Sequence, residues 1–540
     1  MTTRSLQGWV ARQAARAPDA TAVVLDRERT SYEALERRAR RLAGVLREVG
    51  CRPGDRVCLF VPKSPQAIAA MLASLKAGAA YVPIDLGSPA ARVARIVATC
   101  QPRCIVATEE AAPLLRAVLA MGAAPPSARI GWLCGQGRHD AAFGPEDIEL
   151  APEATGDGSA GGDAAHILFT SGSTGQPKGV VITHDNVLAF LRFAAAHFGI
   201  GPDDRLSGHS PLCFDLSTFD IYGALTAGAE LHLVPPRLNL LAPRLAEFIR
   251  DSALTQWFSV PSALAYLTRF DAVAEGDFPS LRRVLWCGDV LATGAAPPSA
   301  RIGWLSGQGR RDAAFGPEDI ELAPEATIAS SYHTVEACPA SDREPIPIGR
   351  ACDGERLLVL DDDLRSSPPG AVGHLYIAGA GLSPGYYGDP DKTRAAFVEI
   401  TAADGSPDRI YRTGDLARRD EAGLIWFVGR ADTQIKGRGY RIELGEIEAA
   451  ASAVDAVGEC AVVALASEGF EGATICLAYA PRPGVELAPT QLRTDLSRLL
   501  PPYMLPSRWA KLPDLPKNAH GKIDRTALRE RFSDHAPSTP

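Results

Sequence analysis

The sequence lacks the cysteine patterns of zinc-binding or disulfide-stabilised proteins. Its 11 Cys among 540 residues include no Cys-x-x-Cys, and only Cys100 and Cys104 lie close together. This spacing indicates neither a zinc site nor a disulfide framework. Reduced and mostly buried thiols, as in a cytosolic enzyme, are the expectation.

Long hydrophobic runs and an excess of basic residues are also missing. No stretch reaches about 18 uninterrupted apolar residues, and the N-terminus lacks the apolar segment of a secretion signal. The 64 Asp and Glu outnumber the 56 Lys and Arg, which gives a net charge of −8. Nucleic acids and anionic membranes favour a basic surface. We therefore expect a cytoplasmic protein with no membrane span and no nucleic-acid partner.

Two common nucleotide-binding motifs are absent as well. No GxGxxG with a downstream acid is present, so a dehydrogenase would rest on a βαβ pattern alone. The stretch LFTSGSTGQPKGVVITH at residues 168–184 also departs from the Walker loop, because Lys178 follows Pro177 and precedes Gly179. The same stretch is nevertheless rich in the groups that bind phosphates.

A Gly-rich turn carrying hydroxyls and one ammonium supplies donors with little steric hindrance. We therefore predict a phosphate-binding loop between strands at 164–169 and 180–183, with a helix at 184–198 after it. A plain flexible surface turn is the alternative interpretation. The candidate phosphate-binding residues are Thr170, Ser171, Gly172, Ser173, Thr174, Gly175 and Lys178.

The chain is longer than one hydrophobic core usually supports, so several subdomains are expected. Strand-like residues 57–61 precede a helix that Ser64 and Pro65 open and that runs to Lys76; a strand at 81–84 follows. Thr30 and Glu33 suggest a capping box for an earlier amphipathic helix. Strand, helix and strand in this order predict an α/β fold with a parallel, doubly wound sheet.

One segment occurs twice. Residues 122–155 and 294–327 differ only at Cys134/Ser306 and His139/Arg311. Two near-identical distant copies do not resemble a solenoid, whose repeats are usually several and divergent. Recent duplication, gene conversion or an assembly error explains them better.

Asp215 stands among Leu212, Phe214 and Leu216. A carboxylate in apolar surroundings is costly unless it meets a cation or hydrogen-bond donors. From the residues alone it is either a helix cap or an ion-pair partner, and the cap is favoured.

The phosphate loop and several later motifs, in the same order, resemble the adenylate-forming superfamily. This superfamily contains acyl-CoA ligases, luciferases and the adenylation domains of nonribosomal peptide synthesis. The resemblance extends from Ser31 to Arg529 and includes GHLYIAGAGLSPGYYGDPDKT, YRTGDL and GYRIELGEIE. It implies a large N-terminal domain of βαβ-type subdomains at 1–431. A small, mobile C-terminal α+β domain at 432–540 would move about a hinge at Asp432.

The resemblance also implies roles for single residues. Asp215 matches the acid that holds the ammonium of an amino-acid substrate. The resemblance therefore favours the ion-pair role of Asp215 over the helix cap. Asp415 would bind the ribose, Arg430 the ribose and phosphate, and Glu325 a magnesium ion. Lys522 would be the catalytic lysine that stabilises the adenylation transition state. The pocket wall would comprise Leu216, Phe219, Ser259, Leu285, Cys287, Ile328 and Ala329.

The second repeat replaces a loop that the family uses to contact adenine and magnesium. Glu321, Leu322, Ala323 and Pro324 stand where the family has Tyr, Gly, Pro and Thr. A short sequence that resembles the replaced family loop begins at Phe315, just upstream. Catalytic impairment is therefore one expectation for this chain.

Together, the resemblance implies an ATP- and Mg²⁺-dependent ligase. It would activate a small, largely apolar amino acid, alanine or proline, as aminoacyl-AMP. The acyl group would pass to the phosphopantetheine thiol of a separate carrier protein, since no carrier domain is evident. An acyl- or aryl-CoA ligase and a non-catalytic binding protein are the alternatives.

Overall fold

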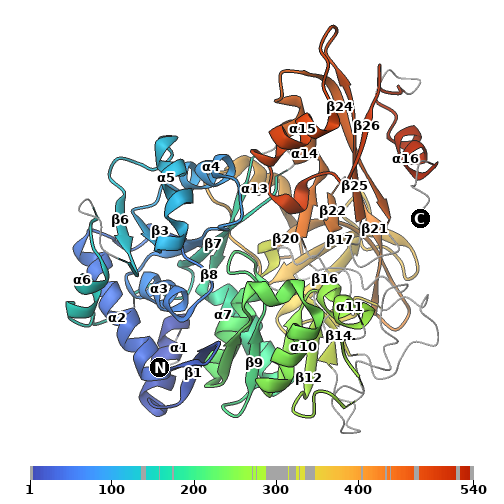
Figure 1. The fold of residues 1–540 in the computed structure, drawn as a ribbon. Helices are drawn as coiled ribbons and strands as arrows, with labels where there is room; N and C mark the ends of the chain where they lie inside the picture. The colour runs from blue at the N-terminus through green and yellow to red at the C-terminus, as the bar shows by residue number, and fades with distance from the viewer. Residues whose placement is uncertain are drawn as a thin grey trace.

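The computed structural model describes two domains of very different size (Figure 1). It covers residues 4–534 except 136–140, 157, 173–175, 271, 275, 287–313, 316–323, 328, 335–346, 403–404, 432–433, 438–439, 467–472 and 518–522. Over these residues, no helix combines the length and apolar character needed to cross a bilayer. The expected α/β class with a large N-terminal and a small C-terminal domain is confirmed.

The first sheet of the large domain contains the predicted βαβ unit. Its strands follow the order β18 (Gly385–Tyr386), β8 (Lys178–Thr183), β7 (Ala164–Thr170), β4 (Ala80–Pro83), β3 (Arg56–Phe60), β5 (Cys104–Ala107) and β6 (Arg129–Trp132). The run from β7 to β6 pairs in parallel, whereas β8 and β18 add antiparallel strands at one edge. Its helices are α3 (Pro65–Lys76), α4 (Ala90–Cys100), α5 (Ala112–Ala120) and α6 (Pro145–Leu150).

Local capping explains where the helices begin. The Ser64 hydroxyl accepts a hydrogen bond from the Ala67 N–H, at 3.2 Å, at the start of α3, as predicted. The capping box predicted at Thr30 is wrong, because Thr30 pairs with Val23 inside strand β2 (Glu28–Ser31). Helix α2 (Tyr32–Glu48) is capped by Ser31 instead.

The second sheet carries the elements near Asp215. Its strand order is β12 (Arg283–Trp286), β11 (Gln256–Ser259), β9 (Arg205–Gly208), β10 (Glu230–Leu233), β1 (Thr21–Leu25) and β2. All of these pairs are parallel except β1 with β2. The surrounding helices are α1 (Leu6–Arg16), α7 (His184–Phe198), α8 (Leu216–Thr218), a π-helix (Phe219–Gly223), α9 (Ala224–Ala227), α10 (Ala242–Asp251) and α11 (Pro261–Arg269).

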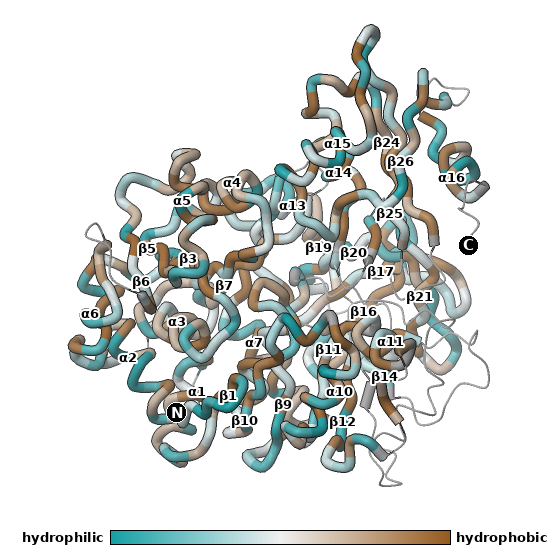
Figure 2. Tube along the Cα trace, viewed as in Figure 1, coloured by the Kyte–Doolittle hydropathy of each residue, from teal (hydrophilic) through white to brown (hydrophobic). Residues whose placement is uncertain are grey.

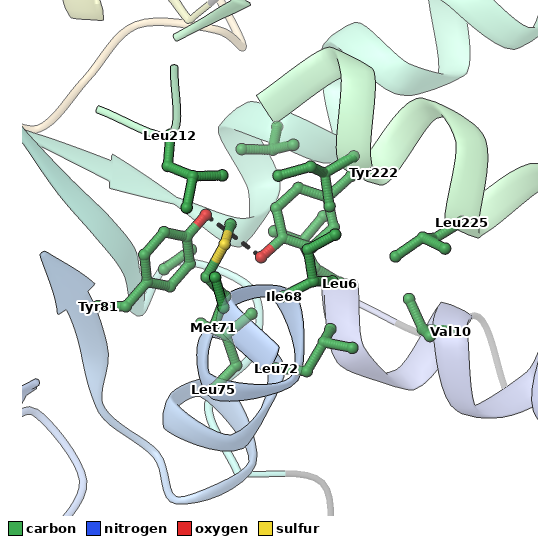
Figure 3. Close-up of a cluster of buried hydrophobic side chains, with 14 of the residues drawn as sticks. Leu6, Val10, Ile68, Met71, Leu72, Leu75, Tyr81, Leu212, Tyr222 and Leu225 are labelled. Carbon is green, nitrogen blue, oxygen red and sulfur yellow. Dashed lines mark hydrogen bonds between the residues drawn. The ribbon is translucent and has the colours of Figure 1, made fainter. Parts of the chain in front are cut away.

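One buried core joins these two sheets. In Figure 3, Tyr222 from the π-helix donates a hydrogen bond to Tyr81 of β4, with 3.2 Å between the hydroxyl oxygens. Ile68 and Met71 of α3 pack beside the pair, and all four side chains are buried. In Figure 2 the outer helices α2 and α6 carry hydrophilic stretches. The two sheets therefore meet through an apolar interior with a satisfied polar contact.

The rest of the large domain is mostly antiparallel. Its elements are β13 (Ala314–Phe315), β14 (Ser331–Thr334), β15 (Arg350–Ala351), β16 (Glu355–Leu360), β17 (Val372–Gly379), α13 (Pro390–Ala396), β19 (Phe397–Thr401), β20 (Pro407–Arg419) and β21 (Ile425–Arg430). The small domain comprises β22 (Gln434–Gly437), β23 (Tyr440–Glu443), α14 (Leu444–Ser452), β24 (Val457–Ala466), β25 (Ala473–Pro481), α15 (Pro489–Ser497), β26 (Arg508–Lys511) and α16 (Arg525–Asp534). Ile447, Leu477 and Leu492 are buried in its own core.

Candidate active site

The predicted phosphate loop joins two antiparallel strands. Thr170 at the end of β7 pairs with Lys178 at the start of β8, so both ends of the loop face each other. Ser171 and Gly172 are buried, and Ser173, Thr174 and Gly175 lie outside the described residues. Within the part of the chain that the structure covers, the buried Thr170 hydroxyl has no hydrogen-bond partner. The loop thus offers a hydroxyl and an ammonium on one turn.

Glu325 lies directly against this loop. Its Oε1 is 3.1 Å from Lys178 Nζ and accepts a hydrogen bond from the Tyr386 hydroxyl at 2.7 Å. The Glu325 side chain is 0% exposed and that of Lys178 is 12% exposed. A buried carboxylate is stable only when cations and donors surround it. The predicted metal residue and the predicted phosphate lysine are therefore neighbours, although far apart in sequence.

Tyr386 is a site residue that the sequence did not single out. It lies in β18, opposite Val180 of β8, and Lys178 Nζ is 5.0 Å from the centre of its ring. The motif GYYG was noted as part of the resemblance. No local pattern identifies which tyrosine of the pair points to Glu325, because the contact depends on sheet pairing.

Asp215 caps a helix, as the residues alone suggested. Its Oδ1 accepts a hydrogen bond from the Leu216 N–H at 2.9 Å, at the start of α8. The residue is 7% exposed. A carboxylate at a helix N-terminus is also favoured by the helix dipole.

Part of the predicted pocket wall lies near the carboxyl ends of the parallel strands β11 and β12. Phe219 packs edge-to-face on Phe258 of β11, with ring centres 5.2 Å apart, and Phe258 pairs with Leu285 of β12. Ser259 accepts a hydrogen bond from the Trp257 indole N–H at 2.8 Å. Leu216, Phe219, Ser259 and Leu285 are buried, and Ala329 packs against the same core. Cys287 and Ile328 lie outside the described residues.

Asp415 and Arg430 form a cross-strand pair. They are directly opposite each other on β20 and β21, and the Arg430 Nη1 donates to Asp415 Oδ1 at 2.7 Å. Asp415 is fully buried beside the guanidinium. The two residues predicted to bind the ribose side of ATP are thus held together by a charge-assisted hydrogen bond.

The small domain contacts the large domain close to these elements. Glu446 of α14 forms a buried ion pair with Arg92 of α4. Tyr440 of β23 packs edge-to-face on Phe214, the residue before Asp215, with ring centres 5.0 Å apart. Burial raises the pKa of Glu446, and the Arg92 guanidinium opposes that shift. Asp432 and Lys522, the predicted hinge and catalytic residues, lie outside the described residues.

Comparison with known proteins identifies the class that this fold and site define. The AMP-binding enzyme family matches residues 10–387, and the AMP-binding enzyme C-terminal domain matches residues 446–522. The chain therefore belongs to the AMP-binding enzyme family, the adenylate-forming superfamily that its phosphate loop resembles.

The particular relatives include an amino-acid ligase and proteins of nonribosomal peptide synthesis. An L-proline–(L-prolyl-carrier protein) ligase of Streptomyces coelicolor is 34% identical over 92% of this chain and 91% of its own. A dimodular nonribosomal peptide synthase of Bacillus subtilis is 35% identical over 99% of this chain, which spans 21% of that protein. The structure of holo-PA1221, an NRPS protein containing adenylation and PCP domains, is 28% identical with a TM-score of 0.77, covering 98% of this chain and 84% of that one.

Proposed function

We propose that this chain activates an amino acid with ATP and transfers it to a carrier protein. The amino-acid carboxylate attacks the α-phosphorus of ATP, the bond to pyrophosphate breaks, and aminoacyl-AMP forms. A phosphopantetheine thiol on a separate carrier then attacks the acyl carbon, releasing AMP and the thiol proton. The observation that carries the amino-acid assignment is Asp215, a buried carboxylate at the edge of an otherwise uncharged wall.

The phosphate loop and Glu325 support the nucleotide half of this proposal. Thr170, Lys178 and the remaining loop residues bind the leaving pyrophosphate, while Asp415 and Arg430 hold the ribose. Magnesium is usually bound in proteins by one or two carboxylates together with substrate phosphates, and Glu325 beside the phosphate loop fits that pattern. When bound, the ion would offset the charge of the phosphates. Lys522 supplies a cation to the developing negative charge, and the small domain turns about Asp432 between the two half-reactions.

The substrate is a small, largely apolar amino acid, with alanine or proline favoured. None of the wall residues Leu216, Phe219, Ser259, Leu285, Cys287, Ile328 and Ala329 is charged. The 34% identical ligase named for L-proline supports the same class. A fatty or aryl acid, which has no ammonium for Asp215, is the competing substrate class.

An amino-acid panel in pyrophosphate exchange tests this proposal. We expect exchange with alanine or proline and none with fatty or benzoic acids. Exchange with the latter acids alone would establish an acyl- or aryl-CoA ligase. ATP binding without exchange for any acid of the panel would establish a non-catalytic binding protein.

The repeat is tested in the same assay. The comparison variant changes Glu321, Leu322, Ala323 and Pro324 to Tyr, Gly, Pro and Thr and keeps Glu325 in place. If the repeat impairs catalysis, only the variant is fully active. Equal exchange by both proteins would show that the duplicated segment leaves the enzyme competent.

Glu325→Gln should weaken the response to magnesium. Removing outer-shell partners of metal sites costs 10–100-fold in affinity, so loss of a ligand should raise the half-saturating Mg²⁺ concentration by at least about tenfold. Titrating pyrophosphate exchange with Mg²⁺ at fixed ATP measures this change. Glu153→Gln is the matched control, since Glu153 stands in the same sequence context in the first repeat but is exposed. An unchanged half-saturating Mg²⁺ concentration for Glu325→Gln would show that Glu325 is not a magnesium ligand.

A further inference from the structure

Lys63 lies where the two large sheets approach each other. It follows β3 of the first sheet, and its Nζ donates hydrogen bonds to the carbonyl oxygens of Gly208 at 2.6 Å and His209 at 2.8 Å. The carbonyl oxygen of Ser210 is 3.5 Å away. Gly208 is the last residue of β9, in the second sheet, and His209 and Ser210 follow it. One ammonium therefore binds the start of the segment that leads to Asp215.

Asp220 holds the same segment from its other end. Its Oδ2 accepts a hydrogen bond from the Ser210 N–H at 3.2 Å, although Asp220 itself lies in the π-helix after Asp215. This hydrogen bond joins the two ends of the loop 210–220, and Asp215 lies in the middle of that loop. The next anchor is Tyr222, whose hydroxyl is bonded to Tyr81 of the first sheet (Figure 3). π-Helical turns are often found at functional sites.

Lys63 and Asp220 also influence each other's pKa. Burial raises the pKa of Asp220, and the Lys63 ammonium opposes that shift. Burial lowers the pKa of Lys63, and the Asp220 carboxylate opposes it. Removing either partner would leave an uncompensated group in a low-dielectric interior. Without Lys63, the loop would lose both the donor to its carbonyl groups and the electrostatic partner of Asp220.

We propose that Lys63 is a positioning residue for substrate binding. With Asp220 it fixes the loop that carries Asp215, so that this carboxylate meets the ammonium of the amino acid. This inference rests on the proposed function, which assigns that ammonium contact to Asp215. Lys63 acts through the loop, because its Nζ donates to the carbonyl oxygens of Gly208 and His209, so we expect its effect on the amino acid and not on ATP.

A double-mutant cycle in pyrophosphate exchange tests the proposal. The proteins are the full chain, Lys63→Met, Asp215→Asn and the double variant, assayed with whichever of L-alanine and L-proline gives the higher exchange. A misplacement of about 1 Å can cost roughly 10²-fold, so we expect Lys63→Met to raise the amino-acid KM by at least about tenfold. The KM for ATP should stay unchanged. In the Asp215→Asn background the same change should add little, because coupled residues are not additive.

Lys76→Met is the matched control for stability. Lys76 is also a buried lysine paired with a carboxylate, with 2.7 Å between its Nζ and Glu36 Oε1, but it lies at the end of α3. Its loss should lower the thermal midpoint without changing the amino-acid KM. A Lys63→Met effect that is additive with Asp215→Asn, or equal for ATP and amino acid, would overturn the inference alone. If Asp215→Asn leaves the amino-acid KM unchanged, the proposed role of Asp215 fails as well.

Discussion

Lys522→Met should lower the rate of amino-acid-dependent pyrophosphate exchange by about 10²- to 10³-fold, the usual cost of removing one donor that stabilises transition-state charge. Negative charge develops between the attacking carboxylate and the α-phosphate, and the proposed role of Lys522 is to supply a cation there. Transfer of the aminoacyl group from preformed aminoacyl-AMP to a carrier thiol should be unaffected. The two half-reactions therefore respond differently to one substitution.

The control for this prediction is Lys517→Met. Lys517 is in the same C-terminal segment, its side chain is exposed, and its Nζ is 2.6 Å from Glu459 Oε1. Exposed pairs of this kind contribute little to stability, so exchange should remain near that of the unchanged chain. Equal losses in both half-reactions for Lys522→Met would argue for a folding defect and against the catalytic role.

Asp215→Asn should sharply weaken the use of amino acids while preserving the helix cap. Asn is as good a capping residue as Asp, so α8 keeps its first hydrogen bond. Breaking a buried ion pair costs about 3–5 kcal/mol, which corresponds to a loss of about 10²- to 4 × 10³-fold in kcat/KM for the amino acid. Pyrophosphate exchange over a range of amino-acid concentrations measures this loss.

Asp389→Asn provides the comparison for the capping role. The Asp389 side chain accepts a hydrogen bond from the Lys392 N–H at 3.0 Å at the start of α13. Its replacement by Asn should leave exchange unchanged. If Asp215→Asn is equally silent while Asp215→Ala lowers the thermal midpoint, Asp215 is a cap and the amino-acid assignment loses its main support.

Local patterns predicted much of the large domain. Helix α7 spans the predicted residues 184–198, because Thr183 and Asn186 cap it reciprocally. The strands on both sides of the phosphate loop were also predicted, since their apolar residues and the glycine-rich turn are consecutive in the chain. The cap of α2 was placed one residue early, because strand pairing occupies Thr30 and no local pattern reveals that pairing.

Contacts between distant elements could not be predicted in this way. The sequence indicated Lys178 and Glu325 separately, from a motif and from a resemblance. Their 3.1 Å approach, and the hydroxyl of Tyr386 beside them, depend on two strands and a 3₁₀ turn from different parts of the chain. Lys63 and Asp220 gave no signal in the sequence, because neither belongs to a recognised pattern.

The duplicated segment shows the difference between local sequence and tertiary surroundings directly. Both copies end in Leu-Ala-Pro-Glu-Ala-Thr, yet Glu153 is exposed whereas Glu325 is fully buried. The threonine that ends the second copy, Thr327, has a left-handed φ of 47°. Its hydroxyl donates a hydrogen bond to the Gly381 carbonyl at 2.7 Å. Motifs and short-range periodicity in the chain are enough to predict the family, the α/β class and the phosphate loop. Which of two identical glutamates meets Lys178 depends on the fold, because burial and charge pairing are set by what surrounds a residue.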